Sequence, residues 1–205
     1  MMAPSPHPLP SLADLRAALD GLTPGDVPIA TSKRLSTAIA LNGQHYRIGK
    51  IWANRAFVVR RGRAYLLYVH VDYRGYRGAA LRVFSPTAAR VDYDHALGRA
   101  IAKSLGFTYV LMLRVPRDVN RSHGRLERPT PRVGLILKKT CLTDPRILGK
   151  MLGLPGRGFK RSETAYDVSA AHNPPLTEAE YRTWAFALGV DLAHPPPMGL
   201  SPISR

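Results

Sequence analysis

The chain has 205 residues, of which 45% are hydrophobic, so its composition is that of a folded protein and not of a disordered tail. Its 30 Lys and Arg residues exceed its 14 Asp and Glu residues, for a net charge of +16, and no apolar run reaches the length of about 18 residues that a membrane-spanning helix needs. A single cysteine, Cys141, excludes an intrachain disulfide and a cysteine-based zinc cluster, and no secretory signal pattern opens the chain, so we expect a reducing, cytoplasmic location.

The first predicted elements are a leader and two helices. Residues 1–10 contain four prolines, which interrupt regular structure, and are predicted to form a flexible leader. Ser11 is followed three residues later by Asp14 and by leucines at helical spacing, which predicts a capped helix that ends near Gly21. A second short helix is predicted from about residue 32 to residue 41.

After this point the pattern becomes that of β-strands. Short runs rich in Val, Tyr, Leu and Phe alternate with turn residues, which predicts an antiparallel meander. The predicted strands are residues 45–52, 56–60, 64–71 and 79–84. The third run is apolar at both odd and even positions, so we expect this strand to lie in the centre of the sheet.

The second half of the chain mixes helices, strands and basic loops. Asp94 is predicted to cap a helix that Gly106 ends, and the apolar run 108–115 predicts a buried strand. Residues 116–132 contain three prolines and many arginines, and are predicted to form a long polar loop. The remaining predictions are a strand at 133–138, a short helix near 144–152, a glycine-rich basic turn at 153–161, and a helix that Thr177 and Glu180 cap and Gly189 ends.

Together these elements predict an α+β fold. We expect a single domain with an antiparallel-dominated sheet, helices packed on one side of it, and mobile proline-rich ends. The predicted organisation is a leader at 1–10, a basic α+β domain at 11–168, a C-terminal helical segment that packs on the domain at 169–194, and a flexible tail at 195–205.

The positive charge is concentrated in the middle of the chain. The segment from Arg47 to Arg161 carries 25 basic and six acidic side chains, while the segments before and after it are neutral or acidic. Such a surplus repels itself in a compact fold, and a polyphosphate backbone is an effective source of neutralising charge. A genome with high GC content favours arginine without functional cause, but this bias does not explain why acidic residues avoid the segment.

A doubled Tyr-Arg-Gly sequence is the first candidate binding motif. Glycine lets the backbone approach a phosphate, arginine offers forked donors, and tyrosine offers a ring on which a base can stack. A surface turn whose rings fold onto the sheet is the structural alternative. The candidate residues of this motif are Tyr73, Arg74, Tyr76 and Arg77.

Further candidate phosphate contacts come from two arginine-rich stretches. An arginine loop on a sheet scaffold is suited to hold phosphates, and a solvated loop is the alternative interpretation. The candidates in and before the predicted 116–132 loop are Arg114, Arg117, Arg121, Arg125 and Arg128. The candidates in the glycine-rich turn are Arg157, Lys160 and Arg161.

Two histidines and an arginine suggest a phosphoryl-transfer site. His95 and His123 could act as an acid–base pair, and Arg99, one turn after His95, could stabilise negative charge on a phosphorane. Imidazoles suit this role because they titrate near physiological pH. The alternative is structural, since a histidine is more often a polar residue at a helix start or in a loop.

Metal and cofactor sites are not predicted. Asp92 and Asp94 are close in sequence and are of the type that binds Mg²⁺ or Mn²⁺, but Asp94 is better explained as a helix cap. The turn at 153–161 lacks the order of glycine, lysine and serine or threonine found in a nucleotide-binding P-loop. We therefore expect no metal and no cofactor.

The predicted function is nucleic-acid binding, to DNA or RNA, mainly through the phosphate backbone and through a surface between residues 47 and 161. One alternative is a small nuclease or phosphoryl-transfer enzyme, of toxin or mobile-element type, that uses His95, Arg99 and His123. The other is a regulatory module whose basic surface docks on an acidic protein partner.

Overall fold

The computed structural model describes residues 11–32, 41–124, 136–137, 140–143, 145–156, 176–190, 192 and 197–203. Its helices are α1 (Leu12–Leu19), the 3-10 turn η1 (Pro24–Asp26), α3 (Tyr76–Val83), α4 (Arg99–Ser104), α5 (Arg117–His123), α6 (Pro145–Met151) and α8 (Glu178–Ala187). None of the helices in these ranges is long and apolar enough to cross a membrane. The predicted leader at 1–10 and most of the predicted helix at 32–41 lie outside the described residues.

The strands form one open, antiparallel sheet. They are β1 (Pro28–Thr31), β2 (Gln44–Ile48), β3 (Ala56–Arg61), β4 (Ala64–His70), β5 (Val91–His95), β6 (Tyr109–Pro116), β7 (Ile136–Leu137), β8 (Thr140–Leu142) and β9 (Leu200–Pro202). The strand order is β7-β8-β1-β6-β4-β3-β2-β9, and β5 pairs with the second half of β6. Every pair is antiparallel, so the predicted α+β class and antiparallel sheet are confirmed.

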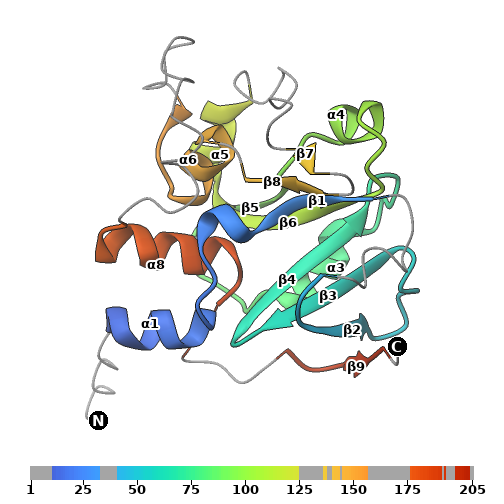
Figure 1. Ribbon diagram of the computed structural model, residues 1–205, viewed down its shortest axis with the longest axis horizontal. Helices are drawn as coiled ribbons and strands as arrows, with labels where there is room; N and C mark the ends of the chain where they lie inside the picture. Colours follow the sequence, from blue (N-terminus) through green and yellow to red (C-terminus); the bar gives the residue numbers. More distant parts are fainter. Residues whose placement is uncertain are drawn as a thin grey trace.

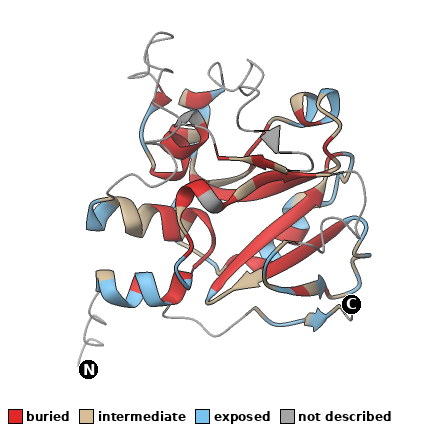
Figure 2. Cartoon of the chain, viewed as in Figure 1, coloured by how far each residue is buried: buried red, intermediate tan, exposed pale blue. Residues whose placement is uncertain are grey.

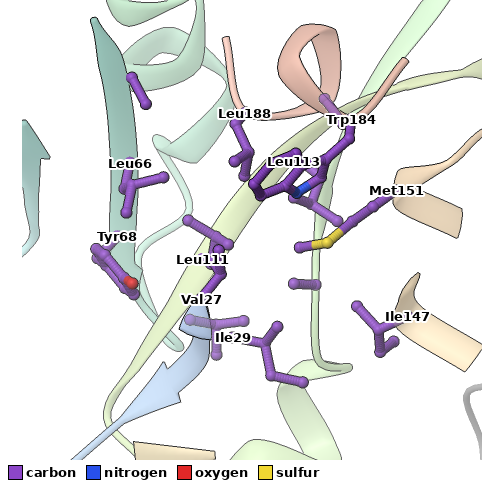
Figure 3. Close-up of a cluster of buried hydrophobic side chains, with 14 of the residues drawn as sticks. Val27, Ile29, Leu66, Tyr68, Leu111, Leu113, Ile147, Met151, Trp184 and Leu188 are labelled. Carbon is purple, nitrogen blue, oxygen red and sulfur yellow. The ribbon is translucent and has the colours of Figure 1, made fainter. Parts of the chain in front are cut away.

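The sheet is covered by helices on both faces (Figure 1). Helices α1, α5, α6 and α8 pack on one face and enclose the larger core, to which Trp184, Met151 and Leu111 contribute (Figure 3). Helix α3 packs on the other face, where Ala80 and Val83 contact a second apolar cluster. The prediction that helices pack on one side of the sheet is therefore correct for α1, α5, α6 and α8, whereas α3 packs on the other side.

Strands β4 and β6, in the centre of the sheet, are buried on both faces. In β4, Leu66 and Tyr68 point into the larger core while Leu67 and Val69 point toward α3. All of β4 except His70 is buried, as expected for a strand that lies between β3 and β6 (Figure 2). The prediction that this strand is central is confirmed.

The helices that the sequence marks with capping boxes form where predicted. Ser11 accepts a hydrogen bond from the Asp14 N–H at the start of α1, and the Asp14 carboxylate accepts one from the Ser11 N–H. Thr177 and Glu180 form the same pair at the start of α8. The strand predicted at 108–115 forms as β6, and the helix predicted near 144–152 forms as α6.

Three predictions in the middle of the chain are wrong. Residues 79–84 belong mostly to helix α3, not to a strand, because Ala79, Ala80 and Val83 are spaced to bury one helical face. Asp94 lies within strand β5 and does not cap a helix; Gly98 occupies the cap position of α4. The predicted loop at 116–132 begins with helix α5.

The predicted flexible tail at 195–205 also contains a strand. Within it, β9 pairs with β2 along the outer edge of the sheet, with Ser201 opposite Arg47. Ile203 continues this contact, because its N–H donates to the His45 carbonyl at 2.9 Å. These backbone bonds fix residues 200–203 to the domain.

Candidate functional site

A groove of about 580 Å³ opens at the edge of the sheet, between α3 and α5. Strand β5 forms its floor, and because α3 and α5 pack on opposite faces of the sheet, they form its two walls. We call this hollow the edge groove. Its lining residues are Tyr76, Arg77, Leu81, Val91, Asp92, Tyr93, Asp94, Arg117, Asn120 and Arg121.

Helix α5 is oriented by its buried side and by its contacts with β5. Val119 and His123 are buried beneath it, which leaves Arg117 and Arg121 exposed at the groove. The Asp92 carboxylate accepts from Arg117 Nε at 3.3 Å and from Asn120 Nδ2 at 3.1 Å. These bonds hold α5 against the strand and neutralise part of the acidic floor.

A second carboxylate on the floor is paired with a buried lysine. Asp94 points to the same side of β5 as Asp92 because side chains alternate along a strand. Its Oδ2 pairs with Lys150 Nζ from α6, and the Lys150 side chain has no exposed surface, whereas 30% of the Asp94 side chain is exposed. The ammonium group is therefore buried while its partner faces the groove.

Tyr76 links the opposite wall to the end of the floor. Its ring lies edge-on to the His95 imidazole, with centroids 4.7 Å apart and an interplanar angle of 61°. The guanidinium carbons of Arg77 and Arg99 each lie 5.9 Å from the centre of the same ring. Tyr76 therefore brings two cations and one histidine together beside the groove.

The groove and its rim are positively charged. Five cationic side chains line or adjoin it, and two carboxylates oppose them; the cations are Arg77, Arg99, Arg117, Arg121 and Lys150. Lys150 and Arg117 are paired with Asp94 and Asp92 respectively. Arg77 and Arg121 have no carboxylate partner within the described part of the chain, so their charge is available to an anionic ligand.

Two of the buried histidines, His95 and His123, have lowered pKa values. Burial lowers the pKa of His95 to about 4; Arg99 and Lys150 add to the effect, and Asp94 opposes it. Burial also lowers the pKa of His123, whose Nε2 lies 2.7 Å from the Leu154 carbonyl. Both imidazoles are consequently neutral at physiological pH.

The structure brings together some of the sequence-predicted residues. Tyr76, Arg77, Arg117 and Arg121 line one groove, and His95 and Arg99 meet at Tyr76. The remaining described candidates lie as follows: Tyr73 half-buried and Arg74 exposed in the turn before α3, and His123 buried at the end of α5. Outside the described residues lie Arg125, Arg128, Arg157, Lys160 and Arg161.

Arg114 does not belong to a surface site, and its prediction as a phosphate contact is corrected. It is only 2% exposed, and its guanidinium donates to the carbonyls of Ser85 and Phe186 at 2.9 and 3.2 Å. Its guanidinium carbon also lies 3.9 Å from the centre of the Phe186 ring. Arg114 therefore joins β6 to α8 and to the chain after α3, inside the protein.

Sequence reasoning missed the acidic floor and the lysine that supports it. The sequence presents Asp92 and Asp94 only as metal ligands or as a cap, and gives no reason to single out Lys150. The alternation Asp-Tyr-Asp is the one local signal, because it places both carboxylates on one face of a strand. The partner of Asp94 is 56 residues away, and no local pattern indicates it.

Comparison with known proteins found no matching family model, no matching curated protein and no matching solved structure. The chemistry of the edge groove is the remaining guide to function. It combines arginines on two facing helices, a half-buried tyrosine ring, and a strand whose carboxylates are already paired.

Proposed function

We propose that this protein binds nucleic acid, mainly through phosphate groups, at the edge groove. The observation that carries the proposal is the convergence of Arg77 from α3 with Arg117 and Arg121 from α5. These arginines lie on separate helices that pack on opposite faces of the sheet, yet their side chains line one hollow. Arg99 adds a fourth guanidinium beside Tyr76.

The charge of the groove supports a polyanionic ligand. Bringing several guanidinium groups together costs electrostatic free energy, and the two carboxylates of the floor offset only part of that cost. Phosphates relieve the remaining repulsion and accept the forked hydrogen bonds of arginine. Each phosphate that is neutralised also releases condensed cations from the nucleic acid, which strengthens binding at low salt.

The first test compares two triple variants with equal loss of charge. Arg77→Ala/Arg117→Ala/Arg121→Ala removes three cations from the groove. Arg47→Ala/Arg55→Ala/Arg63→Ala removes three exposed cations from the β2–β3–β4 meander, outside the groove lining. Affinity for a labelled oligonucleotide is measured by fluorescence anisotropy between about 50 and 200 mM salt.

We expect wild-type affinity to fall linearly with salt on logarithmic axes. The groove variant should bind at least about tenfold more weakly, with a salt slope reduced by roughly one for each phosphate that it no longer neutralises. The meander variant should keep most of the affinity. An absence of binding even at low salt, or an equal loss in both variants, would falsify the proposal.

A nuclease activity is the second candidate, favoured by the contact of His95 and Arg99 with one tyrosine ring. His95 is neutral at physiological pH, as a general base must be, and its Nε2 is buried without a partner in the described residues. In this role the imidazole takes the proton of the attacking hydroxyl while Arg99 stabilises charge on the phosphorane; the bond from phosphorus to the leaving oxygen then breaks, and the imidazolium returns the proton to that oxygen. The candidate requires that oligonucleotide cleavage is detectable and is lost in His95→Ala while binding is retained; binding without cleavage by the wild type excludes it.

A further inference from the structure

We infer that the edge groove receives a single strand of nucleic acid and not a duplex. This inference rests on the proposed function and names the form of nucleic acid that the groove takes. Three features lead to it: a strand edge on the floor that no described strand covers, cations on both walls, and apolar side chains on the α3 wall. Each feature can contact a nucleic-acid strand whose bases are unpaired.

The outer edge of β5 offers backbone hydrogen bonds. Strand β5 pairs with β6 along one edge, and no described strand pairs with its other edge. The Ala96 N–H donates to the Leu111 carbonyl at 2.8 Å, and the Arg117 N–H donates to the Arg90 carbonyl at 3.0 Å. Even-numbered residues of β5 therefore bond to β6.

By the alternation of an antiparallel ladder, Val91 and Tyr93 direct their N–H and C=O groups away from β6. Both residues line the groove and are only partly buried. Their backbone groups can donate to and accept from the edges of bases. In a duplex, the Watson–Crick edges are already paired and cannot make these bonds, so the floor favours unpaired bases.

The walls place cations on both sides of this floor. Arg77 lies on α3, and Arg117 and Arg121 lie on α5, with β5 between them. A single strand that runs along β5 has phosphates within the hollow and cations on either side. Proteins that read a duplex instead project a helix or a β-ribbon into one of its grooves, whereas here the two helices border a concavity.

The groove also exposes apolar side chains, which do not contribute to the binding of phosphates. Leu81 of α3 lines it with 66% of its surface exposed. Tyr76, five residues earlier in the same helix, is half-buried in the same wall. Such side chains contact the faces of unstacked bases, as in proteins that bind single strands with little sequence preference.

An extended acidic peptide that pairs with β5 as an added strand is the competing occupant, since it also uses backbone groups and positive charge. The arginines on both walls and the apolar wall together favour a chain of phosphates and bases. The experiment therefore measures binding of a labelled 12-nucleotide single strand and of the matched labelled duplex at one salt concentration. Polyglutamate is then added as a competitor of the labelled single strand.

The decisive variant is Leu81→Ser, because it alters the groove without removing charge or a buried group. Its control is Met198→Ser, since Met198 is 92% exposed and lies outside the groove lining. We expect the wild type to bind the single strand about tenfold or more tightly than the duplex. Leu81→Ser should weaken single-strand binding by roughly fivefold and leave duplex binding unchanged, while Met198→Ser changes neither.

Two kinds of failure are distinguishable. Equal or tighter binding of the duplex, or single-strand binding that is insensitive to Leu81→Ser, overturns the inference while nucleic-acid binding itself stands. Displacement of the single strand by polyglutamate at equal charge concentration also overturns it and favours the acidic peptide. If neither nucleic acid binds at low salt, the proposed function fails as well.

Discussion

At the scale of single residues, the pair of Asp94 and Lys150 shows how a charge is held inside this fold. The ammonium of Lys150 is taken fully out of water, and the Asp94 carboxylate keeps part of its exposure at the groove. Removal of one partner from a buried ion pair is costly when the other charge remains buried. The two members of this pair should therefore respond differently to substitution.

We predict that Asp94→Asn destabilises the protein more than Lys150→Met does. The first change removes the Asp94 carboxylate from beside a buried ammonium and should cost about 3–5 kcal/mol. The second leaves a carboxylate that can hydrate at the groove, so its cost should be smaller. Urea unfolding of both variants measures the difference, and Asp92→Asn serves as a control on the same strand face. A larger loss in Lys150→Met than in Asp94→Asn would contradict the prediction.

His95 should make stability depend on pH between about 4 and 6.5. Its pKa is lowered from 6.5 to about 4 in the folded protein, so the unfolded chain takes up a proton that the folded protein does not. The stability contribution of the neutral imidazole is complete above pH 6.5 and is lost as pH falls toward 4. The loss corresponds to about 3 kcal/mol.

The variant His95→Leu tests this by removing the titrating group. Its free energy of unfolding should fall less steeply than that of the wild type between pH 6.5 and 4.5. His70 and His123, whose pKa values are also lowered, account for part of the slope that remains. Identical pH profiles for the two proteins would show that His95 is not the group responsible.

At the scale of helices and strands, the sequence predicts the ends of elements better than it identifies what lies between them. The capping boxes at Ser11 and Thr177 predict α1 and α8 because both partners lie within four residues. By contrast, Pro116 and Gly124 favour the prediction of a loop, although they are the residues that flank α5. Proline and glycine mark a boundary without telling on which side the helix lies.

In the candidate site, too, some residues can be predicted from the sequence and others cannot. The arginines of the groove can be predicted because composition and charge distribution are visible along the chain. The burial of Arg114 cannot, because it depends on carbonyls 29 and 72 residues away in sequence. Residues that interact with distant backbone have no local pattern, so their structural role is visible only in the folded protein.

The turn between β3 and β4 gives a prediction at this scale. Gly62 has a φ of +55°, and a Cβ placed there would overlap the Ala18 carbonyl oxygen. The Arg63 N–H donates to this same oxygen, so the hairpin is bonded to the end of α1. Gly62→Ala should therefore separate two packed elements as well as strain the backbone.

We expect Gly62→Ala to cost about 2–3 kcal/mol in the free energy of unfolding. Gly21→Ala is the matched control, because Gly21 has a φ of +67° and no atom lies within 4 Å of the position that a Cβ would take there. The control should cost only about 1 kcal/mol from the backbone conformation. Thermal or urea unfolding compares the two, and equal losses would show that the packing against α1 is unimportant.

At the scale of the whole molecule, the net charge of +16 should affect folding in the absence of any ligand. Self-repulsion of like charges destabilises a compact state, and salt screens it within about 10 Å at 0.1 M. We predict that the melting temperature rises as NaCl increases from about 20 to 200 mM, opposite to the effect on nucleic-acid binding. Differential scanning calorimetry measures this, and a melting temperature that falls over the range contradicts it.

The order of strands in the sheet has a consequence for how the chain is made. Strand β1 lies between β6 and β8, so both of its neighbours are synthesised long after it. On a translating ribosome, the β2–β3–β4 meander can pair as soon as it leaves the exit tunnel, while β1 waits for residues 109–116. Chaperones that shield apolar strands of nascent chains would therefore find Ile29 and Ala30 uncovered until more than half of the protein has emerged.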